Sequence, residues 1–312
     1  MTAAPDATAP LETAPIHTAP IHAEPPAAPP EPTPRRPMSF EARLFSDALS
    51  ILAVGVLGFV LFALVISPRQ QHDDQQRLHA TFRGQAAEAV VPTGGLINPG
   101  TPVAQLRIPG LNLDQIVVEG TSSSDLRTGP GHRRDTPLPG QAGWSMIYGK
   151  AVTFGGPFGQ IDLLRPNDRI TVTTGQGDFT YRVRDVRHVG DPLPPVPVGD
   201  AGRLTLETST GPNILQHNGT VYVDADLLGS GAPATGDRPQ LIPPEEGEMA
   251  SDSSANIALV LWLQALGVVL GLIVWARRRW ARGPALVVGV PILVAVVWNI
   301  YLTVANLLPN ML

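Results

Sequence analysis

The sequence predicts a mainly β domain of the barrel type outside the cell, held in a membrane by three helices. Three apolar runs each approach the length needed to cross a bilayer. Seven short segments between the first two runs have the pattern of strands, and turn residues separate them. The chain has 312 residues and no Cys, so disulfides and thiolate chemistry are excluded.

Residues 1–47 are expected to form a disordered cytoplasmic tail. Prolines recur every five residues from Pro5 to Pro25, with few large apolar residues between them. Such a composition cannot bury a core and favours polyproline II conformation. A ligand for a cytoplasmic adaptor is the functional alternative, and the composition fits both interpretations.

The three apolar runs are predicted as transmembrane helices over residues 48–66, 256–276 and 285–308. A helix needs about 20 residues to cross about 30 Å of hydrocarbon. The first run lies too deep in the chain for a cleaved signal peptide, so it is interpreted as an anchor. Arginines precede it, and four more lie in the 277–284 loop. The positive-inside rule then places the N-terminus and this loop in the cytoplasm, and the barrel domain and C-terminus outside.

Composition divides the outer part of the chain into three pieces. Residues 67–102 are polar and predict a stalk that continues the first helix, whereas residues 229–255 are rich in Pro, Gly and acidic residues and predict a linker. Residues 103–228 form the domain between them. The predicted strands are Val103–Ile108, Gln115–Val118, Trp144–Tyr148, Arg169–Thr174, Phe179–Val186, Arg203–Ser209 and Thr220–Ala225, with a short helix at Pro157–Leu164. Their alternation favours a closed or rolled antiparallel barrel.

Short motifs follow one another through this domain in a specific order. They are Val103–Leu113, Val117–Thr121, Gly129–His132, Pro139–Gly140, Ile147–Gly149, Gly156–Phe158 and Leu204–Leu206. In kind and order they resemble the landmarks of sortases, particularly the class E-like type of Actinobacteria. The resemblance implies an eight-stranded sortase barrel. In that family the barrel is an extracytoplasmic transpeptidase that joins sorted proteins to cell-wall or pilin amines.

The resemblance also marks three catalytic positions, and this chain differs from the family at each. Lys150 stands where the family has His, Ser209 where it has Cys, and Thr220 where it has Arg. A thiolate is a far better nucleophile than a hydroxyl, so we expect a degenerate enzyme that acts as a binding or scaffolding module. The alternative is an active transpeptidase or hydrolase in which Ser209 and Lys150, the single lysine, form a dyad.

Glu207, Thr208 and His132 are assigned to the cleft of this domain. Strand alternation puts Glu207 on the same face as Ser209, which predicts an ion pair with Lys150 that raises the pKa of the lysine. A solvent-exposed position at the strand end is the alternative for Glu207. His132 is expected either at the cleft rim against a ligand or as a polar residue of a turn.

Neither a cofactor nor a metal is predicted, because the His residues lack ligand spacing and Asp224 and Asp226 have no further oxygen donors nearby in sequence. The expected partners are the membrane, envelope proteins or peptides bound in the cleft, and membrane proteins that contact the C-terminal helices. Nucleic acid is excluded, since the net charge is −5 and the basic residues form no stripe outside the membrane flanks.

Overall fold

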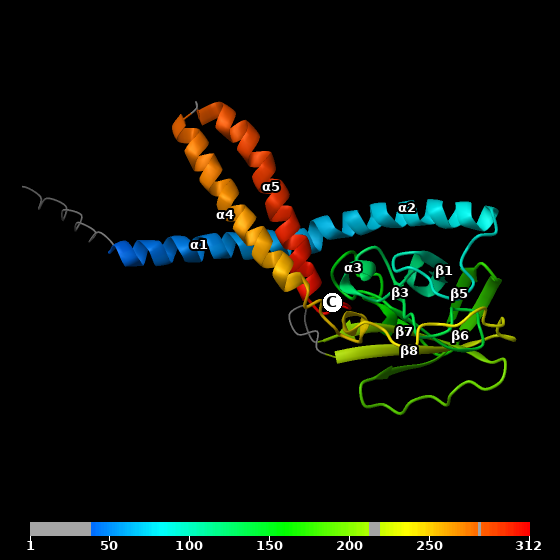
Figure 1. The fold of residues 1–312 in the computed structure, drawn as a ribbon. Helices are drawn as coiled ribbons and strands as arrows, with labels where there is room; N and C mark the ends of the chain where they lie inside the picture. The colour runs from blue at the N-terminus through cyan, green and yellow to red at the C-terminus, as the bar shows by residue number, and fades with distance from the viewer. Residues whose placement is uncertain (1–38, 212–218, 280–281) are drawn as a thin grey trace, which may run out of the picture. The chain divides into compact units, whose positions relative to one another are not determined.

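The computed structural model describes residues 39–211, 219–279 and 282–312. Most of the predicted tail, and part of the predicted Arg-rich loop, therefore lie outside the described residues. The described strands form a closed barrel in the order β1-β2-β3-β4-β7-β8-β6-β5 (Figure 1). The strands are β1 Pro102–Ile108, β2 Leu113–Glu119, β3 Gly131–His132, β4 Gly143–Tyr148, β5 Arg169–Thr174, β6 Gly177–His188, β7 Gly202–Thr210 and β8 Gly219–Leu227. The predicted fold class, an eight-stranded barrel with three long apolar helices, is confirmed.

The strand pairing is mostly antiparallel, but β2 with β3 and β4 with β7 run parallel. The alternation pattern had predicted seven strands. It missed β3, which has only two residues and lies among glycines and prolines. The β4–β7 and β7–β8 pairings bring the ends of three strands together, because Tyr148 lies opposite Glu207 and Ser209 lies opposite Thr220.

Strand β7 is buried on both of its faces. Leu204 and Leu206 point into the barrel core, so the alternating Thr205, Glu207 and Ser209 lie on the outer face. Every residue of β7 from Gly202 to Ser209 is nevertheless buried. Segments from outside the barrel must therefore cover the outer face of this strand.

Short helices and turns connect the strands. Helix α3, Ser123–Leu126, begins with a capping box in which Ser122 and Asp125 satisfy each other's backbone N–H groups. The 3-10 turns are η2 Pro109–Leu111, η3 Ile161–Leu163 and η4 Pro244–Glu246. The helix predicted at Pro157–Leu164 is thus reduced to the single turn η3, since glycines precede it.

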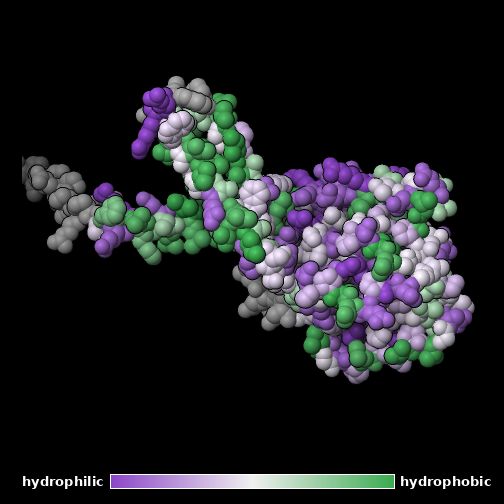
Figure 2. Space-filling view, viewed as in Figure 1, coloured by the Kyte–Doolittle hydropathy of each residue, from purple (hydrophilic) through white to green (hydrophobic). Residues whose placement is uncertain are grey.

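The long helices account for the apolar runs. They are α1 Phe40–Leu61, α2 Ser67–Ala87, α4 Ala255–Arg279 and α5 Arg282–Leu307, with a π-helical turn η1 Phe62–Ile66 between the first two. Three continuous helices, Phe40–Ala87, Ala255–Arg279 and Ala285–Leu307, are long and apolar enough to cross a membrane. Apolar side chains cover α4 and α5, whereas the barrel surface is mixed (Figure 2). The predicted stalk begins as helix α2, which continues α1 and η1 without a break.

The chain divides into two units between Leu49 and Ser50. Within the second unit, the loop after β4 contacts two of the long helices. Phe154 packs with Phe62 and Ala305 in a small apolar cluster, and its backbone N–H donates to the Ser67 hydroxyl at 2.9 Å. The loop that follows Lys150 is therefore anchored on α2 and on α5.

Candidate functional site

Lys150, Ser209 and Thr220 come together at one end of the barrel. Lys150 follows β4, Ser209 lies near the end of β7, and Thr220 is its direct neighbour on β8. All three side chains are buried, with relative exposures of 1–3%. The connection between Ser209 and Thr220 runs through residues 212–218, which lie outside the described residues.

Residues 308–312, which follow α5, run along this end of the barrel. Lys150 Nζ donates to the Asn310 carbonyl at 3.0 Å, and Ser209 Oγ donates to the Met311 carbonyl at 2.9 Å. The backbone N–H of Ala151 donates to the same Met311 carbonyl at 2.9 Å. The two positions that match the family His and Cys thus bind the backbone of one short segment, which we call the 308–312 segment.

Asn310 and Met311 are both fully buried there. The Asn310 backbone N–H donates to the Ala250 carbonyl at 2.7 Å, and its side-chain amide donates at 2.8 Å to Thr121 and to Gly247. Met311 packs against apolar side chains from several elements, namely Leu126, Tyr148, Met146 and Met249. The sequence had placed the C-terminus outside the cell, beyond the third predicted span at residues 285–308, and no signal in the sequence predicted this contact.

Lys150 has no ion pair with Glu207 among the described residues, so that prediction is wrong. Lys150 lies beyond the end of β4, where its amine turns towards Asn310 and lies 5.7 Å from the ring of Phe154. Burial, together with the charge of Arg127, lowers the pKa of Lys150 to about 7. This shift is opposite to the one expected from a carboxylate partner.

Glu207 lies opposite Tyr148 and Tyr222 on the neighbouring strands. Its side chain is fully buried, and neither carboxylate oxygen has a hydrogen-bond partner in the described part of the chain. Burial, and then the nearby carboxylate of Glu248, raise the pKa of Glu207 to about 8, against the opposing charges of Arg133 and Arg187. Glu207 is therefore mainly protonated at neutral pH and is not a solvent-exposed strand-end residue.

The structure places Thr208 beside the residue that precedes Lys150, and it does not place His132 at a cleft rim. Thr208 lies on the opposite face of β7 from Ser209, and its hydroxyl donates to the Gly149 carbonyl at 2.7 Å. His132 is fully buried on β3, where its Nδ1 lies 3.0 Å from Glu119 Oε2. Because Arg238 also binds Glu119, His132 belongs to a buried ionic cluster and is neither a rim residue nor a turn residue.

The predicted linker covers the same region of the barrel. Arg134 forms a bidentate ion pair with Glu246 at 2.9 and 2.6 Å, and Tyr222 donates to Glu248 at 2.5 Å. Residues 246–250 also supply the carbonyls of Gly247 and Ala250 that hold Asn310. The linker and the 308–312 segment together explain why the outer face of β7 is buried.

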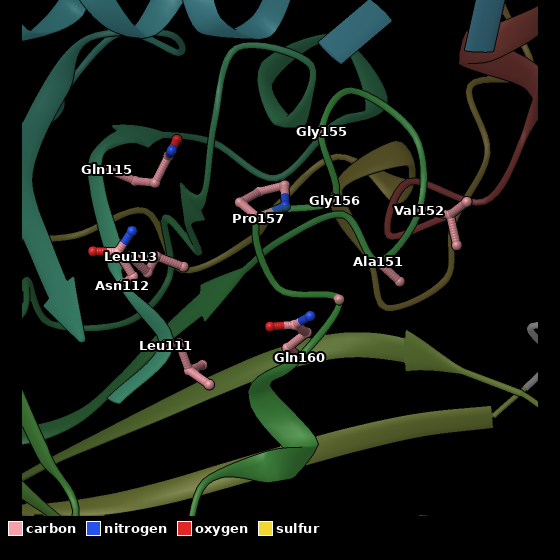
Figure 3. A pocket seen from close by; sticks show the side chains of 11 residues that line it. Leu111, Asn112, Leu113, Gln115, Ala151, Val152, Gly155, Gly156, Pro157 and Gln160 are labelled. Carbon is pink, nitrogen blue, oxygen red and sulfur yellow. The ribbon is translucent and has the colours of Figure 1, made fainter. Parts of the chain in front are cut away.

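A solvent-open cavity of about 450 Å³ is lined in part by the loop that follows Lys150. It is lined by Leu111–Leu113, Gln115, Ala151, Val152, Gly155–Pro157, Gly159 and Gln160 (Figure 3). Lys150, Ser209 and Thr220 do not line it, whereas Ala151 and Val152, which follow Lys150, do. Across residues 39–211, 219–279 and 282–312, no group of three or more His, Asp or Glu side chains is arranged to hold a metal ion.

Comparison with known proteins identifies the barrel. Residues 106–226 match the sortase domain family. Sortase D of Bacillus subtilis (strain 168) is 32% identical over 110 residues, which are 35% of this chain and 48% of that protein. Sortase SrtE1 of Streptomyces coelicolor is 33% identical over 133 residues, which are 37% of this chain and 38% of that protein. The chain thus spans less than half the length of these curated relatives.

Among solved structures, a sortase D5 transpeptidase of Clostridium perfringens is similar to this chain at 21% sequence identity, with a TM-score of 0.43. The match covers 50% of this chain and 99% of that one. The family match covers the barrel and leaves the long helices outside it.

Proposed function

We propose that this chain, which carries a sortase-family domain over residues 106–226, is a membrane-anchored protein of the bacterial cell envelope whose barrel binds peptide segments without catalysing their transfer. One observation carries the proposal. The hydroxyl of Ser209 donates its hydrogen to the Met311 carbonyl, so it is not donated to Lys150 or to any other base. A serine in this state is not an activated nucleophile.

The chemistry of the three replacements supports the same conclusion. A hydroxyl needs a base to remove its proton, whereas a thiolate forms at much lower pKa. The developing oxyanion needs a charged or strong donor, and Thr220 brings only a neutral hydroxyl in place of the family's Arg. We therefore interpret the domain as a pseudoenzyme.

A second candidate function is acyl transfer by a dyad of Ser209 and Lys150. The observation that favours it is the pKa of Lys150, which burial lowers to about 7. A lysine that is partly neutral at physiological pH can act as a general base. The dyad would require the 308–312 segment to leave, because that segment now binds both side chains.

The two functions are separated by a fluorophosphonate probe, which phosphonylates nucleophilic serines with loss of fluoride. The probe is applied to the detergent-solubilised protein and to a variant that lacks residues 309–312, with Ser209→Ala as the control in both backgrounds. We expect no labelling that depends on Ser209. Labelling of the shortened variant that disappears with Ser209→Ala would replace the binding function with the dyad.

The membrane arrangement is part of the proposal. The barrel follows α2, the linker that leads into α4 wraps the barrel, and residues 308–312 return to it after α5. In this proposal the first residues of α4 and the last residues of α5 therefore lie on the same side of the membrane as the barrel. Arg277–Arg279 at the far end of α4 fit the cytoplasmic side by the positive-inside rule, which supports a barrel outside the cell.

We also propose the class E-like actinobacterial type, on the order of the sequence landmarks. The match to Sortase SrtE1 of Streptomyces coelicolor supports this assignment, although Sortase D matches at nearly the same identity. Envelope proteins that present peptide segments to the barrel, and membrane proteins that contact α4 and α5, are the partners that this function requires.

A further inference from the structure

The 308–312 segment is bound in the way a protein binds a peptide ligand. Three consecutive carbonyls, those of Asn310, Met311 and Leu312, accept hydrogen bonds from groups far away in the sequence. The donors include two backbone N–H groups, of Ala151 and Thr153. The segment is turned, since the Leu312 N–H donates to the Pro309 carbonyl at 3.0 Å. Main-chain contacts recognise a peptide of this shape whatever its side chains, so the side-chain contacts must supply the selectivity.

The first selective contact is made by Asn310. Its side-chain amide donates to two carbonyls, of Thr121 and Gly247, at 2.8 Å each. A carboxylate in its place would lose both donors and would face two carbonyl oxygens in a buried site. The position therefore selects a carboxamide over an acid of the same shape.

The second selective contact is made by Met311. Its side chain is fully buried against Leu126 and Tyr148, with Met146 and Met249 beside them. These side chains are apolar or carry a thioether group, and together they accommodate a flexible, unbranched side chain. A charged side chain here would be buried without a partner.

We propose that the groove formed by Thr121, Lys150–Thr153, Ser209 and residues 247–250 is a peptide-binding site occupied by the chain's own residues 309–312. When these residues leave, the groove takes a peptide that adopts the same turn and carries a carboxamide side chain followed by a long apolar one. This inference rests on the proposed binding function and names the ligand class of that site.

The short stretch of chain between α5 and the groove explains why the protein's own residues 309–312 occupy the groove. Helix α5 ends at Leu307, so only a few residues separate it from the groove. A short tether gives an effective concentration of the order of millimolar, which a free peptide of modest affinity does not exceed. Among the described residues, an empty groove would also leave the buried Lys150 amine and the Thr121 carbonyl without partners, whereas the Gly247 carbonyl would keep the Ala250 N–H.

The test uses the full chain in detergent micelles and a fluorescein-labelled synthetic peptide with the sequence of residues 305–312. In fluorescence anisotropy, a variant that lacks residues 309–312 is expected to bind the peptide saturably, at least about tenfold more tightly than the intact chain. The same peptide with Asp in place of Asn310 is expected to bind at least about tenfold more weakly. A folded shortened variant without binding, or equal binding by the intact chain, overturns the proposal.

A second measurement covers the case in which the shortened variant does not fold. Because the chain has no Cys, Ser209→Cys gives a single thiol whose reaction rate reports access to the groove. Adding Met311→Asp is expected to raise that rate at least about tenfold, whereas Met311→Leu leaves it unchanged. Ser230→Cys, at an exposed position, controls for reagent reactivity and reacts equally in all backgrounds. Equal rates for the two Met311 variants would contradict occupancy of the groove.

If the bound peptide is cleaved, the non-catalytic function fails while the peptide site stands. If the fluorophosphonate probe leaves Ser209 unlabelled and no peptide binds, the peptide site fails while the non-catalytic assignment stands.

Discussion

Replacing Glu207 with Gln should remove a pH dependence of stability that this one side chain creates. The carboxyl is fully buried, has no hydrogen-bond partner among the described residues, and lies near Glu248. Its pKa in the folded protein is about 8, against 4.5 for a free side chain. Gln keeps the shape of the protonated acid and cannot ionise.

The direction in which stability changes with pH follows from which state, folded or unfolded, keeps the Glu207 proton. Between about pH 4.5 and 8 the unfolded chain has released it while the folded chain keeps it, so stability falls as pH rises through this window. At 1.36 kcal/mol per pK unit the full difference is about 5 kcal/mol. Relaxation and entry of water around a buried charge reduce this, and we expect about 2–4 kcal/mol.

The measurement is pulse proteolysis in urea on the full chain in detergent, from pH 5 to pH 9. The free energy of unfolding of Glu207→Gln minus that of the wild type should rise by about 2–4 kcal/mol over this range. Glu88→Gln changes an exposed carboxyl on the stalk and serves as the matched control, for which the difference should stay flat. A flat difference for Glu207→Gln as well would refute the argument that Glu207 is buried as the neutral acid.

The other predictions use the same unfolding series or a labelling assay. Lys150 has a folded pKa of about 7 against 10.5 when free, so stability should rise between pH 7 and 10.5, and Lys150→Met should abolish that rise. Arg238→Met should destabilise the barrel by about 3–5 kcal/mol because it removes a partner of buried Glu119, whereas Arg184→Met, at an exposed ion pair, should cost less than about 1 kcal/mol. Equal costs for these two variants would contradict the buried cluster. For topology, Ser253→Cys should react with an impermeant maleimide on whole cells and Arg279→Cys only after permeabilisation, and the reverse pattern would contradict the proposed orientation.

The sequence alone predicted the fold class and the positions to inspect. Apolar runs and strand alternation are local patterns, so they predicted the three long helices and seven of the eight strands of the described barrel. The two-residue strand β3 was missed because so short a strand has no period. The order of the motifs pointed to Lys150, Ser209 and Thr220, which do lie together.

The partners of those residues were decided only by the tertiary structure. The expected Glu207–Lys150 ion pair depended on strand alternation, but Lys150 lies beyond the end of its strand and binds Asn310 instead. The sequence offered a cleft rim or a turn for His132. It could not show that His132 is buried, because its partners in the cluster, Glu119 and Arg238, are not its neighbours in the sequence.

The sequence by itself determined which segments are apolar and which alternate, because these properties belong to the chain locally. Only the tertiary structure decided that residues 309–312 fill the groove beside Ser209. Lys150 and Ser209 bind carbonyls more than 100 positions away, and the pKa shifts of Lys150 and Glu207 depend on burial and on charges from other elements, so no local pattern encodes them.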